Sequence, residues 1–210
     1  MAGVSAIVLA AGSSRRMGTD KLSLPWGDGT VLDAALRPFL ELPGIDEVVV
    51  VVRGGAAPVF ACGRAIVLVN EETDEGMGSS LRVGVGGANP RAEAYILALG
   101  DMPELDADLV AQELAAWRSS GKGILVPVFE GRHGHPVVMS GRYREALLAS
   151  SGDVGARQVV ARNEWDTVLH LVSDPAVVTD LDTHEGYQAL AARRDEWKKF
   201  SGAIDATVGI

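Results

Sequence analysis

A glycine-punctuated polar loop near the start of the chain holds the first candidate binding residues. Gly12 and Gly18 allow the backbone to turn and to approach a ligand closely. Three cations, Arg15, Arg16 and Lys21, lie within seven residues of this loop, although the net charge of the chain is −9. Successive backbone N–H groups in such a turn form an anion-binding concavity. The loop therefore predicts a site for a polyphosphate.

The loop follows directly on the apolar run Val4–Ala10, whose β-branched residues and lack of charge are typical of a buried strand. Two common phosphate-binding patterns do not fit. The dinucleotide fingerprint G-x-G-x-x-G is absent, and the Walker pattern fails because five residues instead of four separate Gly12 from Gly18. A surface loop with chance basic residues is the alternative, which the position after a strand disfavours.

A second segment, Gly100-Asp101-Met102-Pro103, follows the apolar run at residues 95–99. A carboxylate just past a buried strand is held rigidly, and oxygen is the ligand that Mg²⁺ requires. Asp101 could instead cap the next helix, but Asp106 is better placed for that. We therefore expect Asp101 to bind the metal.

The segment Asp180-Leu181-Asp182-Thr183 supplies two more carboxylates. Side chains alternate along an extended chain, so we expect only one of the two aspartates to face the site. We favour Asp182 as the second metal ligand, with Asp180 as the other choice. Helix capping by Asp182 and Thr183 is an equally weighted alternative.

Two further glycine-rich segments predict binding positions. Residues 76–85 open a helix whose N-terminus suits a phosphate, although Ser79 or Ser80 could serve only as the N-cap. In residues 131–136, His133 and His135 would face the same side of an extended chain. A zinc pair is disfavoured there, because no cysteine or third histidine stands near.

The elements that must position these residues alternate along the chain as in a doubly wound sheet. We expect strands at residues 4–10, 47–52, 65–69, 95–99, 124–129, 137–139 and 167–171, and helices at 31–40, 79–87, 106–119, 142–149, 155–161 and 184–199. Thr30, Asp106 and Thr183 are the expected N-caps. The fold class is α/β, a three-layer α/β/α sandwich with a mostly parallel, Rossmann-like sheet in a single domain, residues 1–210. Ligands bind such sheets beyond the carboxyl ends of the strands, where the polar segments should converge.

Together these segments resemble the molybdopterin nucleotidyltransferase family, the MobA-like NTP transferases. The likeness rests on Leu9-Ala10-Ala11-Gly12-x-Ser14-x-Arg16-Met17-Gly18-x-x-Lys21, Gly76-Met77-Gly78-Ser79-Ser80-Leu81, Gly100-Asp101-Met102-Pro103, Gly131-x-x-Gly134-His135-Pro136, Gly152-Asp153-x-Gly155-Ala156-Arg157 and Asp180-Leu181-Asp182-Thr183. His184 and Gly186 depart from the family pattern. The resemblance is strongest to its molybdenum cofactor cytidylyltransferases, because CTP-using members tend to read Leu-Ala-Ala-Gly where GTP-using members read Leu-Ala-Gly-Gly.

The resemblance implies the roles of the site residues. Arg16, Lys21 and Asp101 would be catalytic, and Asp101 and Asp182 would hold Mg²⁺. The nucleotide would be bound by Leu9, Ala10, Ala11, Gly12, Ser13, Ser14, Arg15, Asn70, Gly76, Ser79 and Ser80. The acceptor would be bound by Gly134, His135 and Arg157, although Arg157 could instead pair with Asp153. The implied reaction joins a nucleoside monophosphate from an NTP, favouring CTP, to a phosphorylated acceptor such as molybdopterin and releases pyrophosphate.

Composition narrows the class of protein. The chain has 210 residues, of which 47% are hydrophobic and 22% charged, enough for a proper core. Its acidic balance argues against nucleic-acid and membrane partners. Without an 18-residue apolar span or a basic N-terminal flank, the expected location is the cytoplasm. A single cysteine, Cys62, excludes an internal disulfide.

Other functions stay open at this point. The same chemistry could use GTP or another phosphorylated acceptor. A nucleotide-dependent oxidoreductase is a second possibility, which the missing dinucleotide fingerprint disfavours. The third is a non-catalytic nucleotide-binding accessory protein. A molybdoenzyme or cofactor-insertion protein is a possible partner.

Overall fold

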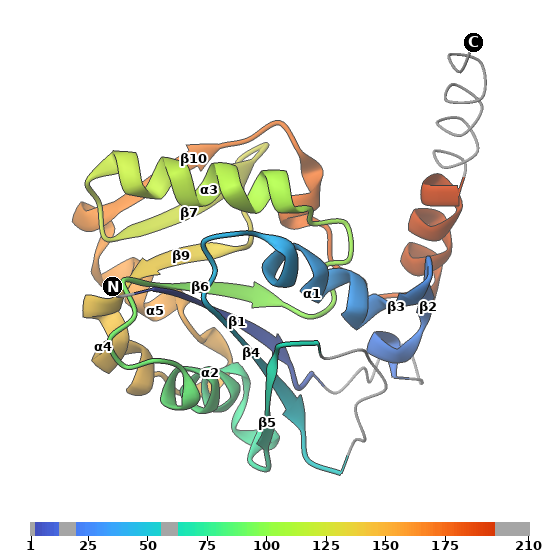
Figure 1. The fold of residues 1–210 in the computed structure, drawn as a ribbon, viewed down its shortest axis with the longest axis horizontal. Coiled ribbons are helices and arrows are strands. Elements are labelled where there is room, and N and C mark those ends of the chain that lie inside the picture. Colours follow the sequence, from blue (N-terminus) through green and yellow to red (C-terminus); the bar gives the residue numbers. More distant parts are fainter. Residues whose placement is uncertain (1–2, 13–19, 56–62, 196–210) are drawn as a thin grey trace.

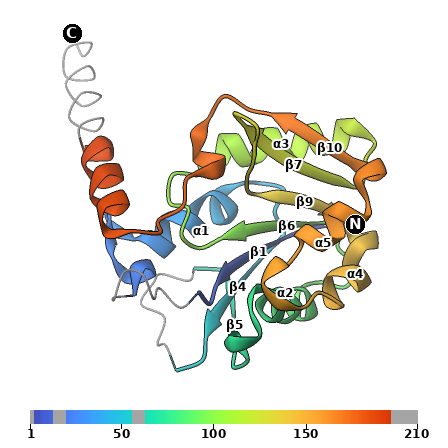
Figure 2. The same ribbon diagram turned by 180° about the vertical axis from the view of Figure 1, so that it is seen from behind.

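A computed structural model of the chain describes residues 3–12, 20–55 and 63–195. A central sheet is covered by helices on both faces (Figure 1). Figure 2 shows the opposite side of the same layers. One face carries α1 (Val31–Glu41) and α3 (Ala107–Ser120), and the other carries α2 (Met77–Gly87), α4 (Arg144–Leu148) and α5 (Arg157–Arg162). The predicted three-layer sandwich is confirmed.

The sheet has the strand order β10-β7-β9-β6-β1-β4-β5. The central strand β1 (Val4–Ala10) pairs in parallel with β4 and β6, β4 with β5, and β7 with β10. Only β9, between β6 and β7, and the short β8, beside β7, run antiparallel in this described sheet. The remaining strands are β4 (Glu47–Arg53), β5 (Ile66–Asn70), β6 (Ala94–Leu99), β7 (Ile124–Phe129), β8 (Arg132–His133), β9 (Val137–Ser140) and β10 (Thr167–Leu171).

The expected strands and most of the expected helices are confirmed to within a residue or two. The hairpin of β2 (Pro25–Trp26) and β3 (Gly29–Thr30) was not expected, nor was β8, because two-residue strands leave no periodic pattern. The segment expected as one helix at 142–149 begins instead as a 3-10 turn at Gly141–Tyr143.

Alternation along β1 divides the core into two layers. Ala6 and Val8 pack on the side of α1 and α3, whereas Ile7 packs on the side of α2, and all three are fully buried. Burial on both faces explains why the strand is a continuous apolar run.

Helix caps fix where several elements begin. Thr30 and Asp33 form a capping box at α1, Asp106 accepts from the Leu109 N–H at 2.8 Å, and Thr183 accepts from the Gly186 N–H at 3.0 Å. These three expectations are confirmed.

The N-cap considered for α2, Ser79 or Ser80, is wrong. That helix begins at Met77 with Gly76 as its N-cap, so Ser79 and Ser80 lie inside it. Gly76 has φ 87°, and a Cβ there would lie 2.8 Å from the Gly152 carbonyl carbon. Glycine is required because the backbone is left-handed and approaches another backbone closely.

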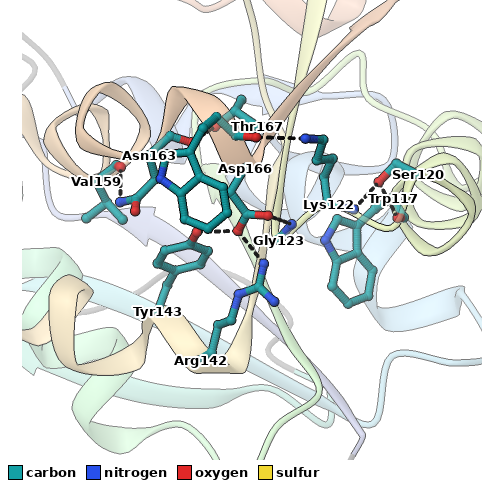
Figure 3. A network of polar contacts seen from close by, with 11 residues as sticks. Trp117, Ser120, Lys122, Gly123, Arg142, Tyr143, Val159, Asn163, Asp166 and Thr167 are labelled. Carbon is teal, nitrogen blue, oxygen red and sulfur yellow. Dashed lines mark hydrogen bonds and ion pairs between the residues drawn. The ribbon is translucent and has the colours of Figure 1, made fainter.

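A buried polar network fixes the start of β10 against β7 and β9 (Figure 3). Asp166, 4% exposed, accepts hydrogen bonds from the Tyr143 hydroxyl and the Arg142 guanidinium, and at 3.1 Å from the Gly123 N–H. Burial opposes ionisation, but these donors outweigh it and hold the pKa of Asp166 below its ordinary value.

The chain after β10 returns to the hairpin and α1. Leu181 is fully buried in a small cluster with Trp26 and Val31, and residues 184–195 form a helix whose Tyr187 hydroxyl donates to the Pro25 carbonyl at 2.7 Å. None of the helices in the described ranges is long and apolar enough to cross a membrane.

Candidate active site

The polar segments predicted to converge do so at the carboxyl ends of β1, β4 and β6. Register brings Ala10 beside Val52 and Leu9 beside Leu99, so the loops that leave these three strands share one edge. A cavity of about 570 Å³ opens there. Among its lining residues are Leu9, Ala10, Ala11, Gly12, Lys21, Gly76, Ser80, Asp101 and Asp182, all of which sequence reasoning assigned to the site.

Three carboxylates meet at one end of this cavity. Asp101, Asp180 and Asp182 each place a carboxylate oxygen within 4.8 Å of the others. The expectation that only one of the two C-terminal aspartates faces the site is wrong. The chain there is not a strand: Leu181 turns into the core and its N–H donates to the Asp101 carbonyl at 3.0 Å, which brings both neighbours toward Asp101.

Lys21 lies against this cluster. Its ammonium is 2.6 Å from Asp101 Oδ2 and 3.2 Å from Asp182 Oδ1. Burial disfavours the charged ammonium, but the charges and hydrogen bonds of the two aspartates outweigh it and raise the pKa of Lys21. Lys21 is therefore a fixed cation beside the acidic groups, a contact that spacing alone did not predict.

The cluster has the donor set of a site for a hard divalent cation. Asp101 Oδ1 is buried and has no hydrogen-bond partner within the described structure, so one ligand atom is available. Burial and the charges of Asp182 and Asp101 raise the pKa of Asp180. Oxygen donors of this kind suit Mg²⁺ and Mn²⁺. The described residues hold no other such group of three metal-binding side chains.

Asn70 does not line the cavity. Its amide is buried, donates at 2.9 Å to the hydroxyls of Ser79 and Ser80, and accepts from the Glu72 N–H. Of these three predicted nucleotide-binding residues only Ser80 reaches the cavity wall. Asn70 and Ser79 instead tie the end of β5 to the first turns of α2.

A second, larger cavity of about 720 Å³ lies beside the first. It is lined by Gly134, His135 and Arg157, the three predicted acceptor residues, together with apolar side chains such as Leu97 and Val177. A Cβ on Gly134 would lie 2.3 Å from the Val177 carbonyl oxygen, so only glycine allows this wall to close. No ion pair joins Arg157 to Asp153 in the described structure, and both residues line this cavity.

His135 is neutral at physiological pH. Burial lowers its pKa and outweighs the hydrogen bond to the Leu97 carbonyl, whose oxygen lies 3.3 Å from Nδ1. A neutral ring that donates from Nδ1 presents Nε2 as an acceptor. The peptide bond from His135 to Pro136 is cis.

The two cavities form one cleft. Five residues line both: Leu9, Met77, Leu99, Asp153 and Asp180. A ligand in either cavity would therefore meet a ligand in the other beside the carboxylate cluster. Such a cleft suits a transfer between two bound molecules, one of them anionic and metal-associated.

Four predicted residues, Ser13, Ser14, Arg15 and Arg16, lie outside the described residues. Sequence reasoning missed Arg53 and Thr73 as cavity residues. Arg53 did carry a signal, because it is the first charged residue after a run of five valines and so marks the carboxyl end of a buried strand.

Fold and site together define an α/β domain with a cleft and a carboxylate cluster at the carboxyl edge of its sheet. Residues 6–168 match the family model described as the MobA-like NTP transferase domain. The chain belongs to this family.

The relatives carry different functions. The chain is 32% identical over 194 residues to the nicotine blue oxidoreductase of Paenarthrobacter nicotinovorans, covering 87% of this chain and 93% of the relative. It is 24% identical over 196 residues to the molybdenum cofactor cytidylyltransferase of Escherichia coli, covering 93% and 100%.

Among solved structures, the protein Rv0371c of Mycobacterium tuberculosis is similar with a TM-score of 0.81 and 29% identity, covering 91% of this chain and 98% of that one. Its manganese complex matches with a TM-score of 0.76 and 26% identity over the same shares of the two chains.

Proposed function

We propose that this protein is a cytidylyltransferase: it transfers CMP from CTP to the phosphate of a molybdopterin-type acceptor and releases pyrophosphate. The observation that carries the proposal is the joined cleft, in which a cavity beside the strand-end loop meets a larger, mostly apolar one at Asp180. The family match and the carboxylate cluster support it.

In this reaction an oxygen of the acceptor phosphate attacks the α-phosphorus of CTP. The bond from the α-phosphorus to the bridging oxygen breaks, and pyrophosphate leaves with the electron pair. The acceptor phosphate is already ionised at neutral pH, so no general base is required. Mg²⁺ held by Asp101 and Asp182, with Asp180 beside them, would offset charge on the phosphoryl oxygens.

The proposed roles of the protein groups follow from their positions. Lys21, with Arg16 from the loop outside the described residues, stabilises charge on the departing pyrophosphate. The strand-end turn Leu9-Ala10-Ala11-Gly12 with Ser13, Ser14 and Arg15 holds the triphosphate, and Gly76 and Ser80 border it. Gly134, His135 and Arg157 hold the acceptor. With a single cysteine the chain suits a reducing compartment, and we propose the cytoplasm.

The choice of CTP rests on Ala11. This residue is 5% exposed and lines the nucleotide cavity, where a methyl group takes space that a purine would need. GTP, or another phosphorylated acceptor, is the nearest alternative within the same chemistry. A molybdoenzyme is the natural recipient of the product.

Pyrophosphate release across a matrix of the four NTPs and candidate phosphorylated acceptors, with Mg²⁺ or Mn²⁺, tests the proposal. We expect release only with CTP and molybdopterin or its molybdenum form together. Release with GTP instead would correct the nucleotide, and release with another acceptor alone would correct the acceptor.

A second candidate function is nucleotide-dependent oxidoreduction, because the chain shares 32% identity with an oxidoreductase over most of both lengths. The apolar cavity could receive a flat aromatic substrate in either case. Oxidation of NADH or NADPH at 340 nm, with a quinone-type dye as acceptor and no NTP present, tests it. Turnover there without pyrophosphate release would favour this candidate over nucleotidyl transfer.

A further inference from the structure

One arginine, Arg53, lines the cavity of about 570 Å³ but takes no part in the proposed transfer. Arg53 ends β4. Its Nε is buried without a hydrogen-bond partner, and its guanidinium makes no hydrogen bond or ion pair within the described structure. Glu72 and Glu75, which follow the neighbouring strand β5, pair with Arg82, and the Glu71 carboxylate lies against Gly54. A half-buried guanidinium without partners is costly unless a ligand completes it.

The position of Arg53 separates it from the phosphate end of the cavity. The carboxylates and Lys21 lie past the end of β6, whereas Arg53 lies past the end of β4, with β1 between them. Two strand spacings place the two backbones about 10 Å apart. Ala11 and Gly12, which follow β1, also line the cavity, so a nucleotide bound there with its phosphates at the carboxylates would have its base toward β4.

Alternation along β4 fixes the side on which Arg53 stands. Val49 and Val51 pack on the α2 side of the sheet, so Arg53 points to the same side. The first turns of α2 supply Ser80 and Met77 to the cavity there. The guanidinium thus lies at the cavity wall between a strand end and a helix start.

We infer that Arg53 reads the base of the bound nucleotide by donating two parallel hydrogen bonds to adjacent acceptors on its edge. The inference rests on the proposed function. Cytosine offers O2 and N3 side by side, and guanine offers O6 and N7. Uracil places an N–H between its two carbonyls, and adenine sets an amino group beside its ring acceptor. Arg53 therefore selects cytosine and guanine, and the Ala11 methyl then rejects the purine, which leaves CTP.

The test is the dissociation constant of each NTP and of inorganic tripolyphosphate, measured calorimetrically without acceptor. Arg53→Gln should weaken CTP about 10- to 100-fold and leave UTP, ATP and tripolyphosphate within about twofold. Arg53→Lys should lose CTP preference as well, because an ammonium keeps the charge but not the planar fork. Arg37→Gln, an exposed arginine on α1, is the control for net charge.

Two patterns of nucleotide binding would overturn the inference. Equal weakening of all four nucleotides and of tripolyphosphate would assign Arg53 to phosphate binding, and unchanged binding would assign it no ligand role; either overturns the inference. Retained CTP preference in Arg53→Lys would overturn the two-bond geometry. If the wild type binds no NTP while its thermal unfolding matches that of the variants, the proposed function fails first and the inference with it.

Discussion

Lys21 and a divalent cation compete for the carboxylates of Asp101 and Asp182, and this competition can be measured. Lys21 Nζ is 2.6 Å from Asp101 Oδ2, with both side chains largely buried. The pair with Asp182 is weaker, since that side chain is 48% exposed. Asp101 Oδ1 is open to a metal ion, but an ion that also binds Asp101 Oδ2 or Asp182 Oδ1 must displace the ammonium. Lys21→Met removes the competitor, so we expect the variant to bind Mn²⁺ more tightly than the wild type does.

The size of the effect follows from the contact that is lost. A hydrogen bond between charged groups contributes roughly 1.5–3 kcal/mol. At about 1.4 kcal/mol per factor of ten, the Mn²⁺ dissociation constant should fall about 10- to 100-fold. Turnover should fall in the same variant, because the cation that stabilises the leaving pyrophosphate is gone.

Water proton relaxation with Mn²⁺ and no nucleotide measures this affinity directly. Lys122→Met is a matched control, because Lys122 is a lysine whose ammonium donates to the Trp165 carbonyl away from the cleft. Weaker or equal Mn²⁺ affinity in Lys21→Met, with the control unchanged, would refute the competition and the metal site with it.

Three other substitutions test separate parts of the account. Asp101→Asn should lower turnover at least about 100-fold at saturating Mg²⁺ with an unchanged melting temperature; near wild-type turnover would show that Asp101 is no metal ligand. Ala11→Gly should raise GTP use relative to CTP in a competition assay, and an unchanged ratio would remove Ala11 from base choice. Asp166→Ala should cost about 2–4 kcal/mol of unfolding free energy in urea, because the Tyr143 hydroxyl and the Arg142 guanidinium lose their acceptor. Since the pKa of Asp166 is lowered from 3.8, its contribution is complete above that pH and is lost as pH falls below it; wild type and variant should converge in stability there.

Much of the fold was predictable because its signals are local. Runs such as Val4–Ala10 and Ile124–Phe129 are buried on both faces and read as apolar without interruption. Thr30 and Asp106 combine a cap with a following helical period, and both caps form. The β2–β3 hairpin was not predictable, since two residues carry no period and its place depends on packing under the 184–195 helix.

The site was predictable in membership more than in geometry. Asp101 follows the end of a strand and Lys21 follows a polar loop, so both could be assigned to the cleft from sequence. Their ion pair could not, because it joins residues 80 positions apart. The aspartates at 180 and 182 were misjudged for a related reason: the burial of Leu181, a tertiary effect, decides where both point.

Asn70 shows the opposite failure. Its place at a strand end suggested ligand contact, but its side-chain amide donates hydrogen bonds to the hydroxyls of Ser79 and Ser80. A polar residue at a strand end can serve the scaffold as readily as the ligand, and only its hydrogen-bond partners distinguish the two. Arg53 stands in the same relation to its strand and lacks such partners within the described structure.

The central claim is nucleotidyl transfer to an acceptor, and the fate of the α-phosphate tests it most directly. CTP labelled with ³²P at the α-position, incubated with the protein, Mg²⁺ and molybdopterin, should give acceptor-linked label and one pyrophosphate for each label transferred. CTP labelled at the γ-position should give labelled pyrophosphate and no labelled acceptor. Label released as free CMP, or label that stays in CTP while NADH or NADPH is consumed with a dye acceptor, would contradict the account.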